Sequence, residues 1–480
     1  EFRATNFQFR GQAVETVYRQ RFLNSELDVE IITGQLETFR EKSENVGAID
    51  ANLDSRIGKG WKLKTKLSRS SQDTFLRRYG YNDNQTLKSE ISANKILNNK
   101  YFQVNASDLQ GLGPSDTEEK EPLILPSIYY ENIENGFYPG QLIKTELSAL
   151  QLDNDESNEM VRWTSLIGLS QQKKMLGGYL TGEVNFLGNY YDIQKTNQSN
   201  VGLSEFGQSN IILSSWWNMP IGSKIGKITG IIEPKIKATY IGGTDRTDEV
   251  PNRDSSDFRL DEANMFLTNR FQGKDFVLPG SHIDVGLSGI TENSFIGDIS
   301  GFTGISYTTS GETTKGLTTR DTEDFSDYVA SLSVFTPLNL EISWSGRADS
   351  NDFELNESRT SAVFFKEKTS ISFLHNQLSK GFFLAAEDDR EEAYLKITQG
   401  LSEGFNISAN QVWDLSSGET KKDKSEISLD WNGGKQNCLA LSLNFKRDPY
   451  ADRDVKKISE VQLLLDFKYL GSIRKSESRN

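Results

Sequence analysis

Residues 461–469 read Val-Gln-Leu-Leu-Leu-Asp-Phe-Lys-Tyr, and this short stretch indicates the fold of the whole chain. Apolar side chains stand at every second position, namely Val461, Leu463, Leu465, Phe467 and Tyr469. The positions between them are polar except for Leu464. Because successive side chains of a β-strand point to opposite faces, the pattern predicts a strand with one apolar and one polar face.

The same alternation recurs along most of the chain, for example in residues 61–67, 338–345, 427–431 and 439–446. Clusters of Asp, Asn, Ser, Gly and Lys separate such segments and are typical of turns and loops, as in residues 153–159, 244–256, 349–358 and 416–424. Apart from a weak signal in residues 23–42, no stretch has helical periodicity. The sequence therefore predicts an all-β chain in which residues 1–480 form one large antiparallel sheet system.

Composition excludes several classes of protein. No apolar run approaches the ~18 residues that a membrane-spanning helix needs, which excludes a helical membrane protein. The chain has 54 Lys and Arg against 68 Asp and Glu, a net charge of −14. Nucleic-acid binding is not expected, because phosphate contacts require basic side chains. The single cysteine, Cys438, has no partner for a disulfide within the chain.

Two architectures are compatible with this alternation. A soluble sandwich or propeller packs its apolar face against another sheet, whereas a membrane barrel turns that face to lipid around a polar lumen. The polar strand positions are strongly polar, and apolar content is on the low side, which favours the barrel. Aromatic residues that recur near expected strand ends also favour it, since they suggest girdles at the membrane interfaces: Tyr129, Tyr130, Tyr190, Tyr191, Trp216, Trp217 and Tyr469.

No motif predicts an enzyme, a metal site or a cofactor. Residues 400–404 match the G-x-S-x-G pattern of hydrolases, but a strand-like segment follows them instead of a helix, so a hairpin turn is expected. A calcium loop starting at Asp153 fails at its sixth and twelfth positions, which are Asn158 and Thr164. Neither His282 nor His375 lies in a recognisable catalytic cluster, so a catalytic histidine is not expected.

Three ordered segments resemble the lipopolysaccharide-assembly barrels of the LptD family, also called the organic-solvent-tolerance family. The most specific lies in residues 257–275 and carries Asp257, Glu262, Asn264, Asn269, Arg270, Phe271, Gly273 and Asp275. Residues 73–79, followed by 109–112 and 122–126, are similar to alphaproteobacterial members. Residues 438–443, with 447–448 and 452–454, resemble the closing strands of the family.

The resemblance implies a transmembrane barrel of about 24–26 strands in the outer membrane of Gram-negative bacteria. The family's preceding periplasmic jellyroll is expected to be absent from this chain, whereas the sequence leaves open whether the first barrel strands are missing with it. The implied function is insertion of lipopolysaccharide into the outer leaflet through a lateral opening of the barrel. Implied partners are an LptE-type lipoprotein plug in the lumen and a periplasmic lipopolysaccharide bridge that binds the jellyroll.

The resemblance also assigns roles to single positions. The final strand is expected around Ile458 to Leu470 and to line the lateral gate, with Val461, Leu463, Leu465, Phe467 and Tyr469. Cys438 corresponds to a family cysteine that in some members bonds to the periplasmic domain. Here it either bonds outside this chain or stays a free thiol, and the thiol is slightly favoured because Asn437 and Leu439 leave no adjacent cysteine. The alternative function is a general or substrate-specific outer-membrane channel.

Overall fold

The computed structural model describes residues 2–478 except 8–10, 38–42, 83, 114–122, 154–157, 196–203, 227, 245, 247–248, 251–259, 272, 278, 294–295, 311–324, 380–388, 403, 417–422, 434–438, 449–457 and 468–470. Within these residues the chain forms 26 strands in one sheet and one short helix. The elements are β1(Phe2–Phe7), β2(Gly11–Arg21), β3(Ser25–Glu37), β4(Ser43–Arg56), β5(Trp61–Ser70), α1(Phe75–Arg78), β6(Thr86–Leu97), β7(Lys100–Gly111), β8(Leu123–Asn135), β9(Gln141–Asp153), β10(Asn158–Met175), β11(Gly178–Lys195), β12(Ser204–Asn218), β13(Ile221–Ile225), β14(Ile228–Gly243), β15(Gly280–Asn293), β16(Asp298–Ser310), β17(Tyr328–Phe335), β18(Leu340–Ala348), β19(Leu355–Lys366), β20(Thr369–Leu378), β21(Arg390–Ser402), β22(Phe405–Asp414), β23(Lys424–Gly433), β24(Leu439–Asp448), β25(Ile458–Phe467) and β26(Gly471–Ser478).

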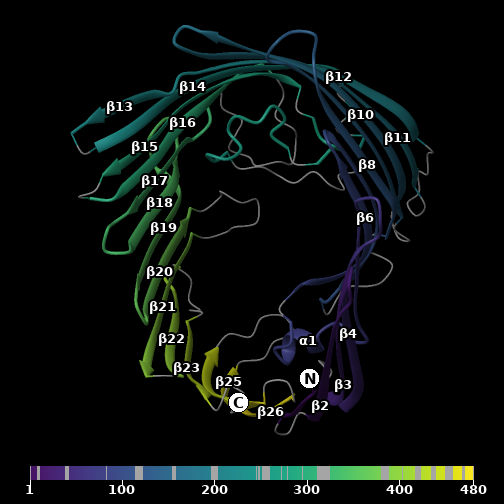
Figure 1. The fold of residues 1–480 in the computed structure, drawn as a ribbon, viewed down its shortest axis with the longest axis vertical. Helices are drawn as coiled ribbons and strands as arrows, with labels where there is room; N and C mark the ends of the chain where they lie inside the picture. Colours follow the sequence, from purple (N-terminus) through teal and green to yellow (C-terminus); the bar gives the residue numbers. More distant parts are fainter. Residues whose placement is uncertain are drawn as a thin grey trace.

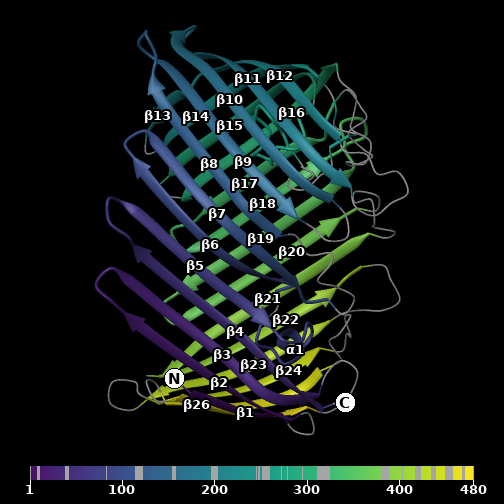
Figure 2. The ribbon, with the colours of Figure 1, turned by 90° about the vertical axis from the view of Figure 1, so that its right-hand side faces the viewer.

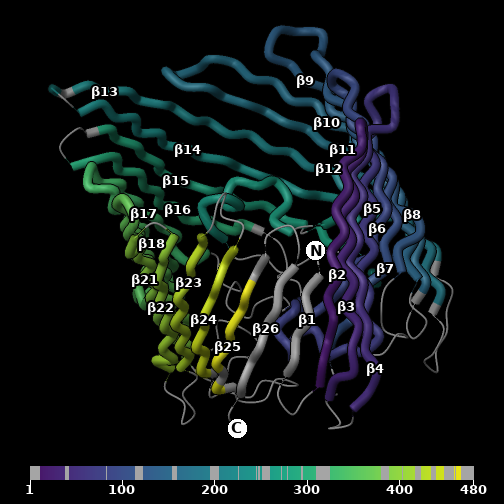
Figure 3. Tube along the Cα trace, turned by 60° about the horizontal axis from the view of Figure 1, so that its bottom comes forward, coloured from purple at the N-terminus to yellow at the C-terminus, as the bar shows by residue number. Residues whose placement is uncertain are grey.

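Consecutive strands pair antiparallel, except that β12 and β13 both pair with β14, and β26 pairs with β1, which closes the sheet into a ring (Figure 1). The strands cross the wall obliquely (Figure 2), and β2–β8 face β13–β18 from opposite sides of the ring (Figure 3). The predicted fold class, a large antiparallel barrel with almost no helix, is confirmed. Among the described residues, no helix is long and apolar enough to cross a membrane.

The strands β12 and β13 form one crossing of the wall, because both pair with β14 in continuous register. Pro220 separates them; proline has no backbone N–H to donate to a sheet, so strands tend to break there. Counted by crossings, the described barrel has 25, an odd number. For this reason β1 and β26 run in the same direction, and they pair in parallel through Arg3–Phe7 and Ser472–Ser476.

The two rims of the barrel differ. On one rim, which we call the turn rim, hairpins such as β6–β7, β10–β11 and β19–β20 are closed by two residues each. Asn98, Leu176 and Glu367 have the positive φ that such tight turns demand. On the opposite rim, the loop rim, the connections are longer, and the longest spans residues 244–279 between β14 and β15.

The alternation separates an apolar outer face from a polar inner face. On β10, Trp163 is 58% exposed and faces outward, whereas its neighbours Arg162 and Thr164 point inward and are buried. Large apolar side chains exposed on the outside recur along the other strands, which is the arrangement that a lipid-facing wall requires.

The aromatic pairs divide between the two faces, so the expected girdle is only partly correct. Tyr190 is exposed on the outside, but Tyr191 is fully buried on the inside. Likewise Tyr129 bonds to Glu131, which an inward-facing lysine contacts, and Lys237 lies over the Trp216 ring. Adjacent residues of a strand cannot face lipid together, because their side chains alternate. Tyr469 lies outside the described residues.

Candidate functional site: the loops folded into the lumen

The connection between β14 and β15 turns back into the lumen and covers the inner wall of the barrel (Figure 1). It carries most of the residues that resemble the LptD signature. Glu262, Asn264, Asn269, Arg270, Phe271, Gly273 and Asp275 all lie in its described part, whereas Asp257 lies outside it. We call residues 260–277, apart from 272, the lumen loop.

Apolar contacts hold the lumen loop against the wall at two places. Leu260 and Met265 pack against Phe302 of β16 and Val329 of β17, with Phe266 beside them. At the other place the loop inserts Val277 among inward-facing residues of the wall, which are Leu187 on β11, Ile212 on β12 and Ile241 on β14. Burial of these apolar side chains stabilises the attachment through the hydrophobic effect, which has no preferred direction.

Two glycines of the wall make room for this packing. A Cβ built on Gly304 would lie 2.5 Å from the Met265 Sδ, and one on Gly286 would lie 2.8 Å from the Phe266 Cζ. A larger residue at either position would displace the Met265 or Phe266 side chain from its place against the wall. These glycines are therefore required by the close approach of the loop and not by a turn.

A buried ion pair joins the loop to β10. The Arg162 Nη1 donates a hydrogen bond of 2.5 Å to Asp275 Oδ1, and neither side chain is accessible to more than a small extent. Breaking a buried pair by removing one partner leaves an uncompensated charge in a low-dielectric site, which is strongly destabilising. The pair therefore restricts where the loop can lie.

Next to this pair, Lys274 of the loop bonds to Glu146 of β9. Lys144 extends the network, because its Nζ lies 3.2 Å from Glu146 Oε2 and 3.0 Å from Glu131 Oε2 of β8. Burial lowers the pKa of the Lys274 ammonium below its ordinary value. The positive charge of Lys144 lowers this pKa further, and the carboxylate of Glu131 acts in the opposite direction.

A second buried cluster ties the loop to β15 and β16. Arg270 Nη2 donates to Asp284 Oδ1 over 2.6 Å and also bonds to the Ser306 hydroxyl. The Ser306 hydroxyl in turn donates to Asp284 Oδ1 over 2.7 Å. His282 lies beside them with its Nε2 3.6 Å from Asp284 Oδ2. In this pair the arginine belongs to the loop and the aspartate to the wall, the reverse of the pair between Arg162 and Asp275.

Lysine and amide groups fix the course of the loop backbone. Lys237 of β14 donates to the Phe266 carbonyl and to Thr268 Oγ1, each over 2.8 Å. Asn269 Nδ2 donates to the Phe276 carbonyl over 3.1 Å, and Asn264 accepts a hydrogen bond from the Asp261 N–H. Gly273 has φ 90°, a conformation that strains other residues, which accounts for glycine in the signature.

The connection between β5 and β6 also folds inward and contains α1, which lies inside the ring in Figure 1. Phe75, Leu76 and Tyr79 are buried with inward-facing apolar residues, namely Ala13, Ile32, Leu36, Val46, Leu87 and Leu112. Arg78 Nη2 donates to Glu37 Oε1 over 2.7 Å. The second segment that resembles the family, residues 73–79, therefore forms a second contact between a loop and the inner wall.

The residues predicted for the lateral gate do not belong to the site around the lumen loop. Val461 and Leu463 lie on the exposed outer face of β25, and Leu465 is half-buried. The strand β25 pairs with β24 and β26, so it is the last strand but one of the described residues and β26 is the strand next to β1. For Phe467 only the strand backbone is described, and Cys438 and Tyr469 lie outside the described residues.

The motifs that could have indicated catalysis are placed apart. Ser402 pairs with Phe405 in the β21–β22 hairpin, which confirms that the G-x-S-x-G match is a turn. His375 Nε2 lies 2.8 Å from Glu391 Oε1, far along the chain from the second histidine. Within the described part of the chain, no group of three or more His, Cys, Asp or Glu is arranged to hold a metal ion.

Sequence reasoning missed the wall residues that receive the lumen loop: Glu146, Arg162, Lys237, Asp284 and Ser306. The sequence carries little signal for them, because polar and charged side chains ordinarily occupy the lumen-facing positions of barrel strands. What the sequence does not contain is the identity of their partners, which lie as many as 128 residues away.

The fold and its contents define a class of protein, namely a large antiparallel barrel with an apolar exterior and a polar lumen into which loops fold. The family model of LptD, described as LPS transport system D, matches residues 44–382, more than two thirds of the chain. The chain therefore belongs to the LptD family, which confirms the resemblance seen in the sequence. This is a transport family and not a family of enzymes, and it acts in lipopolysaccharide transport during outer-membrane assembly. A search of curated proteins found none that matches the chain.

Proposed function

We propose that this chain inserts lipopolysaccharide into the outer leaflet of the outer membrane by opening laterally between β1 and β26. The observation that carries the proposal is the seam itself. Among the described residues it is a parallel pairing in a barrel whose other strand pairs are antiparallel, and it joins Arg3–Phe7 to Ser472–Ser476. By comparison, β10 and β11 pair along Asn158–Met175.

A parallel pair of strands is slightly less stable per residue than an antiparallel pair, and a shorter pair has fewer hydrogen bonds to break. Opening the barrel at β1 and β26 therefore costs less than opening it between two long hairpin strands. The predicted gate strand β25 moves with β26 in this proposal, since the two pair through Glu460–Phe467. The gate role of Val461, Leu463 and Leu465 stays a prediction.

The two faces of the wall suit an amphipathic substrate. The polar inner face keeps a charged sugar head group hydrated, whereas transfer of such a group through hydrocarbon would cost many kcal/mol. The exposed apolar outer face meets the acyl chains once they leave through the seam. In outer-membrane barrels the short turns face the periplasm, so the turn rim is the side on which the substrate enters.

The expected partners follow from the family. An LptE-type lipoprotein is expected to plug the lumen, and a periplasmic bridge is expected to deliver lipopolysaccharide through a jellyroll domain. The two inward-folded loops support a plugged barrel, because they present a shaped inner surface instead of a smooth open pore. A porin-like channel is the competing function, and it would conduct ions steadily without a plug.

The proposal is tested by locking the seam in the full-length protein in cells. Thr5→Cys and Arg474→Cys replace register partners of β1 and β26 in a Cys438→Ser background. The control lock joins the register partners Ile167→Cys and Phe186→Cys between β10 and β11, far from the seam. We expect the seam lock to stop the appearance of new lipopolysaccharide at the surface until a reductant is added, and the control lock to have no effect. Normal delivery through a locked seam would refute the lateral opening, and steady conductance by the purified protein would favour the channel.

A further inference from the structure

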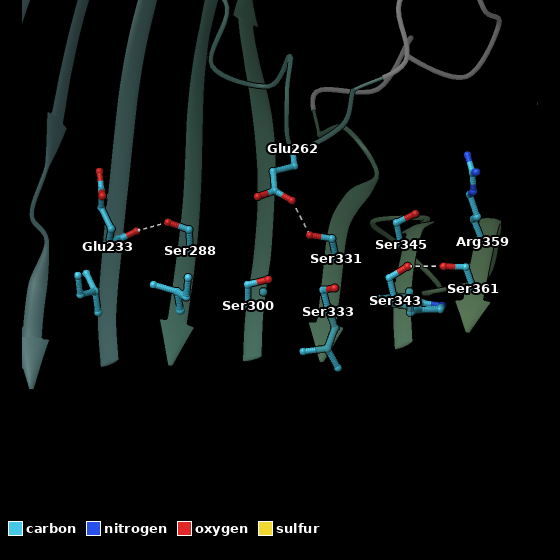
Figure 4. Close-up of a pocket in the computed structure, with 16 residues that line it drawn as sticks. Glu233, Glu262, Ser288, Ser300, Ser331, Ser333, Ser343, Ser345, Arg359 and Ser361 are labelled. Atoms are coloured by element: carbon cyan, nitrogen blue, oxygen red, sulfur yellow. Dashed lines mark hydrogen bonds between the residues drawn. The ribbon is translucent and has the colours of Figure 1, made fainter. Parts of the chain in front are cut away.

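The register of β16–β19 places four serines in one row across the inner wall. Ser300 pairs with Ser333, Ser333 with Ser343, and Ser343 with Ser361, each on the adjacent strand. We call these four residues the serine ladder. Because neighbouring strands are about 4.8 Å apart, the row is about 14 Å long. Figure 4 shows its members side by side on adjacent strands.

The ladder lies on the floor of an open cavity of about 630 Å³ on the turn-rim side of the lumen loop. Ser343 and Ser361 bond to each other through their hydroxyl oxygens, which are 2.6 Å apart. Ser300 and Ser333 make no hydrogen bond through their hydroxyls to any described residue, and both are accessible to solvent. Ordinary cross-strand stabilisation therefore accounts for one pair of the ladder and leaves the other two hydroxyls available.

Charges stand at the edges of this cavity and not along the ladder. Glu262 of the lumen loop accepts a hydrogen bond of 2.6 Å from Ser331, which lies two residues before Ser333 on β17. Glu233 lies at the far side of the cavity. Arg359 lies at the opposite end, as the register partner of Ser345. Two carboxylates near a neutral row of hydroxyls disfavour phosphate groups and leave uncharged polar groups as the suitable ligands.

We propose that the serine ladder is a weak binding track for the neutral sugars of a polyhydroxylated head group as it crosses the lumen. This inference rests on the proposed function and adds to it the part of the substrate that the wall contacts. A serine hydroxyl both donates and accepts, so it can pair with any sugar hydroxyl without a fixed orientation. Each such hydrogen bond contributes little net free energy, because it replaces one with water. Many weak and equivalent contacts allow a chain to enter and also to leave.

Photo-crosslinking from single positions of the full-length protein in cells tests the track. A photoreactive residue replaces Ser333 or Ser343, while Asn52 on the opposite side of the lumen and Val334 on the outer face of β17 serve as controls. We expect both ladder positions to capture lipopolysaccharide severalfold more than either control. We also expect this capture to fall when the cells make lipopolysaccharide with a truncated sugar chain.

Equal capture at Ser333 and Asn52 would overturn the track, because the substrate would then pass without using the ladder. Capture of a protein at Ser333 would overturn it too and would make this wall a protein-docking surface. Surface lipopolysaccharide after depletion of the protein is measured in parallel. If depletion leaves it unchanged, the proposed function fails; if depletion removes it but the ladder captures none, the track alone is wrong.

A second measurement keeps the test independent of the photoreactive residue. Ser333→Val with Ser343→Val replaces two hydroxyls by apolar side chains with one more heavy atom each, and valine suits a strand. The matched control, Ser408→Val with Ser428→Val, removes another cross-strand serine pair on β22 and β23. We expect the ladder variant to deliver lipopolysaccharide severalfold more slowly than the control variant at equal barrel levels, and equal rates would count against the track.

Discussion

Arg162 on β10 and Asp275 in the β14–β15 loop form a buried ion pair across 113 residues of sequence. The arginine is 5% exposed and the aspartate is fully buried. Such a pair connects the wall of the barrel with a segment that would otherwise project beyond its rim. The position of the lumen loop therefore depends on the charge of Asp275, which a substitution can remove.

Replacing Asp275 with Asn is expected to release the lumen loop. The buried Arg162 would lose its charge partner, and breaking a buried pair in this way costs about 3–5 kcal/mol. Limited proteolysis of the folded barrel measures this, since a released loop is cleaved faster. The double variant Arg162→Met with Asp275→Leu removes both charges and should regain most of the protection. If Asp275→Asn is cleaved no faster than the wild type, the pair does not hold the loop.

Replacing Gly304 with Ala is expected to displace the loop by a steric route. The new Cβ would lie 2.5 Å from the Met265 Sδ, and overpacking of this kind costs about 1–3 kcal/mol. The Gly182→Ala variant is the control, because a Cβ there meets nothing within 4 Å. Adding Met265→Val to Gly304→Ala removes the Sδ that the new Cβ meets but keeps an apolar side chain against Phe302 and Val329, so it should restore part of the protection. Failure of this rescue would show that the contact with Met265 is not the cause.

The attachment of the loop is expected to strengthen as pH rises from the lowered pKa of Lys274 to the ordinary lysine pKa of about 10.4. The pKa of Lys274 is lowered in the folded protein by burial, so the unfolded state binds more protons in that window. Stability then increases with pH across the window. Cleavage of the lumen loop should therefore slow between neutral and alkaline pH, and Lys274→Met should reduce that slope. An unchanged slope in Lys274→Met would assign the effect to other groups.

Replacing Phe75 with Ala is expected to destabilise the region of β2–β6. Phe75 is 1% exposed among apolar residues of the inner wall, and loss of a buried Phe costs about 3–5 kcal/mol. Semi-native electrophoresis after stepwise heating measures the temperature at which the barrel unfolds. The Phe137→Ala variant is the control, since Phe137 is 91% exposed in a turn. Equal unfolding temperatures for the two variants would contradict a structural role of the α1 segment.

The strand pattern was predictable because it is local. The alternation at residues 461–469 requires nothing but the period of a β-strand, and the structure has β25 over Ile458–Phe467. The two faces of the strand were predictable for the same reason, and Val461 and Leu463 lie on the exposed face. What failed was the end of the series, because β26 was not recognised as a further strand beyond β25.

The signature residues were found in the sequence, but their contacts were not. Arg270 was predicted as a family residue without a partner, and the structure pairs it with Asp284 and Ser306 on two separate strands. Serine positions such as Ser300 and Ser333 carry no signal in a sequence rich in serine. They form a row because the registers of neighbouring hairpins align them.

The sequence by itself determined that this chain is made of amphipathic strands, and its resemblance to the LptD family pointed to a barrel whose apolar side faces outward. These properties depend on residues close together in the chain. The tertiary structure alone decided that two loops fold into the lumen, that Arg162 meets Asp275, and that β1 closes against β26 in parallel. Each of these contacts depends on the number of strands between the two partners and on the register of each strand pair, which no local sequence pattern specifies.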